Sequence, residues 1–397
     1  MSLGYFMIIQ RQLTPTLLEF AKHFPAVAIL GPRQSGKTTL AKQAFPQHRY
    51  VSFEALDVRT IALTDPRGYL KSLENEHGVI LDEFQHVPTI LSYIQLIIDQ
   101  EYKPGYFILT SSQNFLLNQA ISQTLAGRIG ILTLLPLSIE ELAAQHLLPE
   151  KFEELIFKGG YPRIYSQHFT PAMFYPSYLQ TYIERDVRNI TQITDLSLFQ
   201  KFIQLCAGRI GQILNISSLA NDCGITSNTA KAWLSILESS YIIFLLQPYH
   251  NNFSKRLIKS PKLYFYDTGI ACSLLAIDSE KQIYSHYLKG GLFESLIISE
   301  LLKYFFNLGR KPHIYFWRES HGNEIDCIIQ SGSKIIPIEI KSGQTITPDY
   351  FKGINYWHTI DQSSPGYIIY GDTENYQLKQ GNIVSWKSIN RIFNDFE

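Results

Sequence analysis

The segment from Gly31 to Thr38 limits what this chain can fold into more than any other part of the sequence. It reads Gly-Pro-Arg-Gln-Ser-Gly-Lys-Thr and fits the pattern G-x-x-x-x-G-K-[ST] at every fixed position. A short apolar run at residues 26–30 precedes it, and a helical pattern follows from Lys37 to Ala44. A strand, a glycine-rich loop and a helix in this order form a phosphate-binding loop (P-loop). The segment therefore predicts a nucleoside triphosphate site, and we expect ATP with Mg²⁺ to bind and to be hydrolysed there.

Each residue type in this loop has a chemical role. The glycines let main-chain N–H groups surround the phosphates, Lys37 reaches the β- and γ-phosphates, and Thr38 binds Mg²⁺. The helix that follows directs its positive end toward the same groups. A flexible glycine loop without a ligand is the alternative, but it does not explain the strand and the helix on either side. The residues expected to contact the nucleotide are Gly31, Pro32, Arg33, Gln34, Ser35, Gly36, Lys37, Thr38 and Thr39.

An acidic pair follows a second apolar strand at residues 78–83, Gly-Val-Ile-Leu-Asp-Glu. This strand carries Asp82 to its carboxyl end, where ligands bind in open α/β sheets. We expect Asp82 to hold Mg²⁺ through water and Glu83 to polarise the attacking water. Acidic residues commonly end strands, but the position one strand–helix unit after the P-loop favours the functional interpretation. The second carboxylate also separates this chain from GTPases and kinases, which usually lack it.

Two further positions are candidates for contact with the nucleotide. The next strand ends in Thr-Ser-Ser-Gln-Asn, residues 110–114, where Gln113 or Asn114 could sense the γ-phosphate; polar residues that only cap the strand are the alternative. Arg128 lies between a helical segment and the following strand. An arginine there could stabilise transition-state charge within its own subunit or in a neighbouring one, whereas a surface ion pair is the simpler interpretation. If Arg128 acts between subunits, the protein must form a homo-oligomer.

The first third of the sequence alternates between apolar strands and helices. Strands are expected at residues 50–53, 78–83, 106–112 and 129–134, in addition to the one before the P-loop, and a helix at residues 90–99. Strands that are apolar throughout and alternate with helices predict a parallel sheet covered on both faces. We therefore expect an α/β domain of the P-loop NTPase type over residues 1–137.

The composition limits the remaining function classes. The chain has 397 residues with 35 basic and 35 acidic side chains, and this balance neither indicates nor excludes a nucleic-acid partner. Its four cysteines lie far apart without a C-x-x-C pair, which indicates reduced thiols rather than zinc ligands or disulfides. No apolar run approaches the roughly 18 residues that a membrane helix needs, and the N-terminus lacks a secretory signal. We therefore expect a cytoplasmic protein with no membrane partner.

Helical patterns dominate after Pro136. Residues 138–194 indicate a helical lid or linker, which is broken at residues 159–162, Gly-Gly-Tyr-Pro. Residues 195–268 follow the order of a winged helix, in which a helix-turn-helix precedes a strand and a hairpin. The middle of the chain is therefore expected to connect the ATPase domain to a compact helical module.

The expected helix-turn-helix consists of a short helix at residues 218–222, a turn at Gly224 and a second helix that Ser227 caps, with Trp233 and Leu237 facing inward. A strand at residues 241–246 and a basic hairpin at residues 253–264 follow. The second helix would offer polar side chains to a DNA or RNA groove, and the hairpin would contact phosphates. A protein–protein module is the alternative, because the helix is only weakly basic. The helix residues are Thr226, Ser227, Asn228, Thr229 and Lys231, and the hairpin residues are Lys255, Arg256, Lys259 and Lys262.

Residues 269–397 predict a second α/β domain. A helix opens near residue 290 and is followed by three strands, a helix and a further strand. This order is that of a nuclease-like fold. The strands are expected at residues 313–319, 324–330, 334–341 and 366–371.

Charged residues on these strands suggest a second site. Side chains alternate along a strand, so Glu339 and Lys341 share a face, and the tight connection at residues 331–333 sets Asp326 beside Glu339. Asp326 and Glu339 would bind Mg²⁺, Glu294 would reach in from the helix as a further ligand, and Lys341 would position water or stabilise charge during phosphodiester cleavage. The alternative is a nuclease-like fold that serves as a scaffold and does not cleave.

Several of these segments resemble a known family. The P-loop, the Asp82-Glu83 pair, Thr-Ser-Ser-Gln-Asn, Leu-Ala-Gly-Arg128 and Leu-Pro-Leu-Ser-Ile-Glu-Glu-Leu are similar to bacterial and archaeal AAA+-type ATPases whose C-terminal half is a domain of unknown function. Tyr182-Ile-Glu-Arg-Asp-Val, Tyr266-Asp-Thr-Gly-Ile and residues 323–341 resemble that half. The resemblance covers nearly the whole chain. It implies an AAA+-like ATPase domain followed by a winged helix and a PD-(D/E)xK nuclease fold.

Ser112 departs from this family pattern, because such sequences usually carry glycine there, in Thr-Gly-Ser. The added hydroxyl lies next to the expected sensor, Gln113. The departure therefore bears on which side chain at this strand end meets the nucleotide.

Two functions from different classes account for these features. In the first, ATP-driven changes position a nuclease domain on DNA or RNA. In the second, the protein is a regulatory or signalling ATPase whose nucleotide state controls oligomerisation or partner binding, and the C-terminal domains are non-catalytic binding modules. A metabolic kinase fits less well, because no substrate-pocket motif accompanies the P-loop and the paired carboxylates suit water activation.

Overall fold

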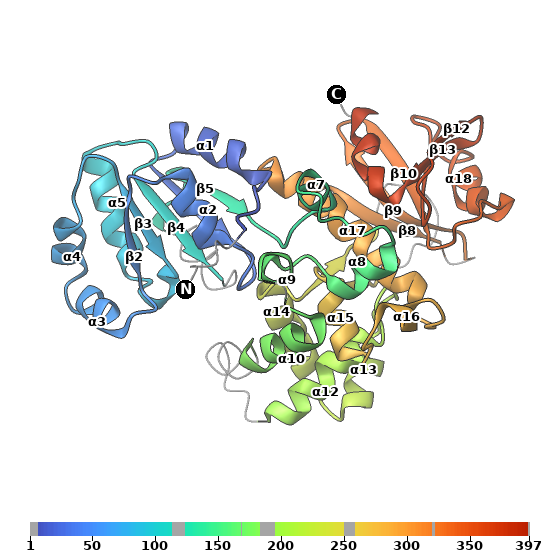
Figure 1. The fold of residues 1–397 in the computed structure, drawn as a ribbon, viewed down its shortest axis with the longest axis horizontal. Coiled ribbons are helices and arrows are strands. Elements are labelled where there is room, and N and C mark those ends of the chain that lie inside the picture. Colours follow the sequence, from blue (N-terminus) through green and yellow to red (C-terminus); the bar gives the residue numbers. More distant parts are fainter. Residues whose placement is uncertain are drawn as a thin grey trace, which may run out of the picture.

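The computed structural model describes residues 7–112, 124–167, 169–182, 195–249, 259–319 and 322–395. Figure 1 shows three lobes: an N-terminal sheet with its helices, a mainly helical middle, and a second sheet at the C-terminal end. The long helix α17, Lys289–Asn307, contacts elements of all three lobes, namely β5, α8, β7 and β10. This helix therefore ties the N-terminal sheet to the rest of the chain.

The N-terminal sheet has five strands in the order β2-β3-β4-β1-β5, and every pair of neighbours is parallel. This confirms the predicted α/β domain with a parallel sheet. The order sets β4 between the strand that leads into the P-loop and the strand that ends at Asp82. The strands are β1 (Ala26–Leu30), β2 (Arg49–Ser52), β3 (Val79–Asp82), β4 (Phe107–Ser111) and β5 (Ile129–Thr133).

Helices cover both faces of this sheet, as the apolar strands predicted. Val27 and Ile29 of β1 pack with α1 and α2 on one face, whereas Ala26, Ala28 and Leu30 pack with α3, α4 and α5 on the other. Because side chains alternate along a strand, a five-residue apolar strand serves both cores. The helices are α1 (Leu13–His23), α2 (Lys37–Ala44), α3 (Leu56–Thr64), α4 (Pro66–Ser72) and α5 (Ile90–Gln100), with a short 3₁₀ turn at Phe84–His86.

The middle lobe consists of helices and one antiparallel pair of strands. Its core is continuous with that of the C-terminal sheet, so that Phe202 and Ile336 belong to one buried cluster. The elements are α7 (Ile139–Ala144), α8 (Phe152–Lys158), α9 (Pro162–Ser166), α10 (Pro171–Tyr182), α12 (Leu196–Ala207), α13 (Ile216–Cys223), α14 (Ser227–Ser239), β6 (Ile243–Leu246), β7 (Lys262–Phe265), α15 (Thr268–Leu274) and α16 (Glu280–Ile283).

The turn between α13 and α14 differs from the prediction in one detail. Gly224 ends α13 with φ of 85°, as expected for a glycine after a helix. The cap of α14 is Thr226, whose hydroxyl accepts a hydrogen bond from the N–H of Thr229 at 3.1 Å. The prediction that Ser227 caps this helix is therefore wrong, because Ser227 is its first helical residue. Trp233 and Leu237 are buried, as expected.

The C-terminal sheet has six strands in the order β12-β13-β11-β10-β9-β8. The first three in sequence pair antiparallel, and β11 then runs parallel to β10. The sequence analysis did not include β12 and β13. Strand β12 is short and exposed along its length, whereas β13 is mostly buried. The elements are β8 (Ile314–Arg318), β9 (Glu324–Ser331), β10 (Lys334–Lys341), α18 (Lys352–Trp357), β11 (Tyr367–Tyr370), β12 (Tyr376–Leu378), β13 (Gly381–Ser385) and 3₁₀ segments at Pro348–Phe351 and Trp386–Asp395.

Two expectations from composition can be compared with the fold. Cys206, Cys223, Cys272 and Cys327 are buried and unbridged, as small apolar residues would be. Within the ranges given above, no helix combines the length and the apolar character that crossing a membrane requires.

Candidate functional site

The P-loop joins β1 to α2 at the carboxyl edge of the parallel sheet. Gly31 and Gly36 have φ of 150° and 97°, values at which glycine is favoured over other residues. A Cβ atom on Gly31 would lie 2.1 Å from the carbonyl oxygen of Leu134. A side chain at Gly31 would therefore push the loop away from the segment that follows β5.

The structure brings Lys37, Thr38 and Asp82 together. Lys37 is buried, and its Nζ donates to the carbonyl oxygens of Gly31 and Pro32 at 2.9 and 2.7 Å. The Thr38 hydroxyl donates to Asp82 Oδ1 at 2.7 Å. An oxygen pair of this kind, a hydroxyl beside a carboxylate, is the donor set that Mg²⁺ prefers. The residues present therefore fit the predicted metal.

Asp82 is held by two more hydroxyl groups. Thr110 donates to its Oδ1 at 2.5 Å and Tyr50 donates to its Oδ2 at 2.9 Å. Thr110 belongs to β4 and Tyr50 belongs to β2, so the strands on both sides of β3 fix this carboxylate. Charged and buried carboxylates are stable only when paired or hydrogen-bonded in this way.

Glu83 lies at the edge of the pocket that contains Lys37. Ser112 donates a hydrogen bond to Glu83 Oε2 at 2.9 Å, and the Gln85 amide donates to the same oxygen. Burial raises the pKa of Glu83, but the charge of Lys37 and these two hydrogen bonds outweigh it and hold the pKa below its usual range. Glu83 is therefore ionised at neutral pH, as a group that polarises water must be.

Ser112 acts on Glu83 at this strand end. Its buried hydroxyl orients the Glu83 carboxylate through the hydrogen bond to Oε2. Gln113 and Asn114, the predicted sensors, lie outside the described residues. The described part of this strand end therefore contributes Thr110 and Ser112, which act on Asp82 and Glu83.

Arg128 lies at the amino ends of the strands, whereas the P-loop lies at their carboxyl ends. It precedes the first residue of β5, and that strand pairs in parallel with β1 from Ile129 opposite Ala26 to Thr133 opposite Leu30. One strand of five residues, about 15 Å, therefore separates Arg128 from the level of the loop. Its Nε pairs with Asp99 at 2.6 Å. This placement excludes contact with the nucleotide of the same subunit; a role in a neighbouring subunit stays a prediction.

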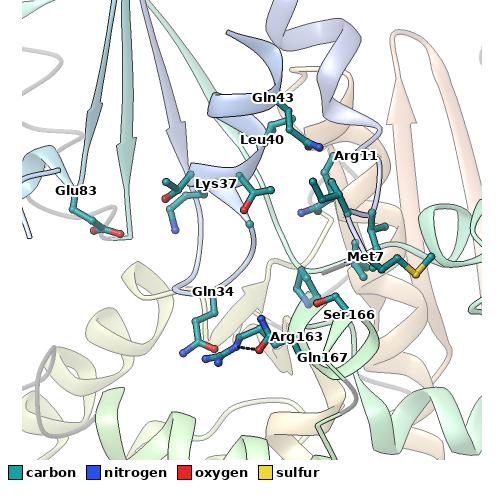
Figure 2. Close-up of a pocket in the computed structure, with 17 residues that line it drawn as sticks. Met7, Arg11, Gln34, Lys37, Leu40, Gln43, Glu83, Arg163, Ser166 and Gln167 are labelled. Carbon is teal, nitrogen blue, oxygen red and sulfur yellow. Dashed lines mark hydrogen bonds between the residues drawn. The ribbon is translucent and has the colours of Figure 1, made fainter. Parts of the chain in front are cut away.

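A pocket of about 420 Å³ opens beside the P-loop. Figure 2 shows that side chains of the P-loop, the N-terminal segment and α9 surround it. Its size suits a nucleotide. The lining includes three predicted nucleotide-binding residues that follow Gly36, namely Lys37, Thr38 and Thr39, together with Gln34.

Arg11 is a residue of this pocket that the sequence did not reveal. Its buried guanidinium donates to the carbonyl oxygens of Ser35 and Leu135, both at 2.6 Å, and pairs with Glu141 at 3.0 Å. Arg11 therefore holds the P-loop against the start of α7. Its partners are distant in sequence, and no local pattern around Arg11 indicated the contact.

Arg163 is the second unpredicted residue. It lies in α9 and lines the pocket, and its Nε donates to Gln167 at 3.0 Å. Among the described residues, no carboxylate forms an ion pair with Arg163. Its guanidinium also lies over the Phe169 ring, 5.0 Å from the centroid, at the wall of the pocket. The Gly-Gly-Tyr-Pro break marks where α9 begins, because proline is favoured at the first helical position, but it does not show where Arg163 points.

The predicted C-terminal residues Asp326, Glu339 and Lys341 also come together. The antiparallel register of β9 and β10 pairs Cys327 with Ile338, which sets Asp326 beside Glu339. Lys341 Nζ lies 3.0 Å from Asp326 Oδ2 and 2.5 Å from Glu339 Oε2. The ammonium group shows that a cation fits between the two carboxylates.

Glu294 lies in a neighbouring set of contacts. Lys262 Nζ is 2.9 Å from Glu294 Oε1 and 2.5 Å from Glu324 Oε1, and Tyr264 also donates to Glu294. Lys262 is buried at the start of β7 and belongs to this cluster. The prediction that it lies on an exposed phosphate-binding hairpin is therefore wrong. Lys255 and Arg256 of that hairpin lie outside the described residues.

The predicted three-ligand metal site is not assembled. Within the described parts of the chain, no group of three or more His, Cys, Asp and Glu side chains is arranged to hold a metal ion. Glu294 is instead paired with Lys262, and Lys341 contacts Asp326 and Glu339. The arrangement leaves Asp326 and Glu339 as a two-carboxylate site with Lys341 between them.

The ionisation of this cluster follows from its burial. Burial and the neighbouring Asp326 charge raise the pKa of Glu339 to about 9. Burial likewise raises the pKa of Glu294 to about 7, against the opposing charge of Lys262. Burial also acts on Asp326, but the charges of Lys341 and Lys262 outweigh it and hold its pKa below the usual range. At neutral pH, Asp326 therefore carries the negative charge, and Glu339 retains its proton.

These side chains open onto a cleft of about 580 Å³. One wall comes from the turn after α12, at residues 211–213, and the other from the C-terminal sheet. Basic side chains, Arg318 and Lys352, lie along the same cleft. The predicted recognition residues Thr226, Asn228 and Lys231 are exposed on α14, whereas Ser227 and Thr229 are half-buried.

Three segments of the chain match protein families. Residues 23–143 match the family described as AAA domain, residues 149–281 match a domain of unknown function (DUF8612), and residues 289–389 match another domain of unknown function (DUF4143). The chain therefore carries an AAA domain and a C-terminal DUF4143 domain. This confirms the coarse form of the predicted resemblance.

The chain is also similar to individual proteins and solved structures, at identities below 30%. An uncharacterised protein of Mycobacterium tuberculosis is 27% identical over 347 residues, which cover 86% of this chain and 76% of that one. An uncharacterised protein of Methanocaldococcus jannaschii is 24% identical over a match that covers 91% of this chain and 83% of that protein. A Walker-type ATPase of Pyrococcus abyssi superposes with a TM-score of 0.44 at 14% identity, over 67% of this chain and 96% of that one. The Thermotoga maritima RuvB Holliday junction branch migration motor has a TM-score of 0.29 at 18% identity, over 59% of this chain and 89% of that one.

Proposed function

We propose that this protein is a Mg²⁺-dependent ATPase that acts on nucleic acid through its C-terminal domains. The observation that carries the ATPase assignment is the direct contact of the P-loop with the acidic pair: the Thr38 hydroxyl bonds Asp82, and Glu83 lines the same pocket as Lys37. The AAA domain over residues 23–143 supports it.

The residues of the pocket divide the work of hydrolysis. Thr38 and Asp82 would hold Mg²⁺, which supplies charge neutralisation for the phosphates. Lys37 exchanges the two loop carbonyls that it now contacts for phosphate oxygens. Glu83, ionised and oriented by Ser112, accepts a proton from the attacking water. Arg163 adds positive charge from α9.

Replacing Lys37 with alanine tests the nucleotide site. We expect the affinity for ATP to fall by about 10- to 100-fold, because a charge-assisted hydrogen bond contributes roughly 1.5–3 kcal/mol. The measurement is titration with a fluorescent ATP analogue and Mg²⁺, with Lys71→Ala, which changes an exposed lysine of α4 in the same domain, as the control. If the folded wild-type protein binds no adenine or guanine nucleotide, the ATPase assignment is wrong.

Arg163→Ala gives a second expected result. Loss of its charge should lower ATP turnover by about tenfold, whereas Arg163→Lys keeps most of the activity, because a cation near the phosphates stabilises the developing charge. Steady-state phosphate release compares the two variants. Equal turnover in wild type and Arg163→Ala would remove Arg163 from the site.

The nucleic-acid part of the proposal rests on the C-terminal cleft. Asp326 and Glu339 flank a cation position, Lys341 lies beside them, and Arg318 and Lys352 line the approach. We assign this domain a PD-(D/E)xK nuclease-like fold, and the α13–α14 pair with β6 and β7 a winged helix. Asp326 and Glu339 would bind a divalent cation, which activates water for phosphodiester cleavage.

A cleavage assay distinguishes this proposal from the regulatory alternative. Wild-type protein with Mg²⁺ or Mn²⁺ is tested on single- and double-stranded DNA and on RNA, with and without ATP. The exposed position of Thr226, Asn228 and Lys231 favours nucleic-acid contact. If the protein hydrolyses ATP but neither binds nor cuts any of these substrates, the chain is a regulatory ATPase with non-catalytic C-terminal domains.

A further inference from the structure

Strand β7 and helix α17 form one buried unit, the β7–α17 unit. The Ser295 hydroxyl accepts from the N–H of Phe265 at 3.0 Å and donates to its carbonyl oxygen at 2.9 Å. Ser299 donates to the carbonyl oxygen of Tyr266 at 2.7 Å. All residues of β7 are buried. Buried elements that share hydrogen bonds along their length move together rather than separately.

The end of this unit at Asp267 contacts the segment that carries Arg163. Asp267 directly follows Tyr266, and its Oδ2 accepts a hydrogen bond from the N–H of Gly160 at 2.7 Å. Three residues after Gly160 comes Arg163, in the wall of the nucleotide pocket. A single buried carboxylate therefore fixes the start of α9 to the β7–α17 unit.

The groups around Asp267 are closely packed. A Cβ atom on Gly159 would lie 2.3 Å from Asp267 Oδ1, and Tyr175 donates to the same oxygen at 2.8 Å. The N–H of Gly269 donates to it as well, at 3.0 Å. A displacement of α9 therefore acts on Asp267, because closely packed groups transmit strain.

Two side chains of α17 make a second connection to the nucleotide pocket. Glu300 Oε2 accepts from the N–H of Ile139 at 2.7 Å, and Lys303 Nζ donates to the carbonyl oxygen of Leu137 at 2.9 Å. Leu137 lines the nucleotide pocket, and its N–H donates to the carbonyl oxygen of Gly160 at 2.7 Å. The two connections therefore meet at Gly160.

The other end of the unit lies in the C-terminal cleft. Lys262 begins β7 and Glu294 belongs to α17, and the two side chains form an ion pair. Lys262 also reaches Glu324 of β9. The cation that neutralises these carboxylates thus belongs to the same unit that holds Gly160.

From this geometry we propose that nucleotide at the P-loop and the charge arrangement of the C-terminal cleft are coupled through the β7–α17 unit, with Asp267 and Lys262 as its two contact points. The proposal rests on the nucleotide site proposed above and adds its regulation. A triphosphate attracts Arg163 and α9 more strongly than a diphosphate does. The resulting displacement of α9 is transmitted through Gly160 and Asp267 to β7 and α17, and it changes the ion pair between Lys262 and Glu324. Because coupling between two sites is reciprocal, a change at Glu324 must in turn alter the preference of the pocket for triphosphate.

The test is a double-mutant cycle on nucleotide affinity in the full-length protein. The ratio of dissociation constants for Mg²⁺-ADP and a non-hydrolysable ATP analogue is measured in wild type, Glu324→Gln, Asp267→Asn and the double variant. We expect Glu324→Gln to change this ratio on the order of tenfold, within the range of known couplings. In the Asp267→Asn background the change should fall below about twofold.

Controls separate the possible failures. Glu150→Gln removes an exposed glutamate that pairs with Lys387, away from β7, and should leave the ratio unchanged. If Asp267→Asn does not fold, Ser299→Ala, which removes one hydrogen bond of the unit, takes its place. The coupling is refuted if Glu324→Gln leaves the ratio unchanged in the otherwise wild-type protein. It is also refuted if the effect of Glu324→Gln is as large in the Asp267→Asn or Ser299→Ala background as in the otherwise wild-type protein. Absence of nucleotide binding in wild type refutes the ATPase assignment instead.

Discussion

Replacing Glu83 with glutamine is expected to lower ATP turnover by about 10²- to 10⁴-fold, the range that general base catalysis contributes, with nucleotide affinity unchanged. Glutamine keeps the shape of the side chain, and Ser112 can still donate to its carbonyl oxygen. It cannot accept a proton from water. Because Lys37, Ser112 and Gln85 hold the pKa of Glu83 low in spite of its burial, the wild-type group is ionised at neutral pH and the substitution removes a full charge.

Single-turnover phosphate release and equilibrium binding of an ATP analogue measure the two parts of this prediction separately. Glu101→Gln is the matched control, because Glu101 is an exposed glutamate of the same domain that pairs only with Lys103 among the ion pairs described. Turnover of Glu83→Gln within a factor of a few of wild type would assign the base to another residue. A parallel loss of affinity would show that Glu83 binds the nucleotide rather than the water.

The P-loop and the acidic pair could be predicted because their chemistry is local in the sequence. Each glycine of the loop is required by its own backbone angle, and Asp82 and Glu83 follow directly from the strand that carries them. The parallel sheet followed from strands that are apolar on both faces. For these features, the sequence and the structure agree because neighbouring residues determine them.

Arg11 and Arg163 could not be predicted, because their positions depend on contacts between distant segments. Arg11 and its partner Glu141 are 130 residues apart, and no periodicity or spacing joins them. Arg163 enters the pocket only because Asp267 and Leu137 fix Gly160. A sequence shows that a helix begins there, but tertiary packing decides where it points.

Lys262 shows why a charge pattern alone misassigns a residue. Four basic side chains in residues 253–264 predicted an exposed hairpin, yet Lys262 is buried among carboxylates that follow 32 and more positions later. A buried lysine keeps its charge only beside such partners. Burial opposes that charge, and Glu294, Asp326 and Glu324 outweigh it and raise the pKa of Lys262. The partners, and not the local pattern, determine its role.

Asp326→Asn is expected to abolish metal-dependent cleavage of nucleic acid, by about 10³-fold or more, with ATP hydrolysis unchanged. Asp326 is the carboxylate of the cleft with a lowered pKa, so it supplies the charge that attracts a divalent cation. A bound metal contributes several kcal/mol of transition-state stabilisation, which corresponds to roughly 10³-fold in rate. Cleavage of labelled DNA and RNA and binding of Mn²⁺ are measured on the same preparations.

Two further substitutions in the C-terminal domain serve as controls for this prediction. Glu374→Gln removes an exposed glutamate from the same domain and should leave cleavage unchanged. Lys341→Met should lose cleavage, because the charge beside the reacting phosphate is gone, whereas Mn²⁺ binding should persist, because Asp326 remains and no ammonium group competes for it. Cleavage that survives Asp326→Asn would mean that the cleaving groups lie outside this cleft. A Lys341→Met protein that cuts as fast as wild type would remove Lys341 from the reaction.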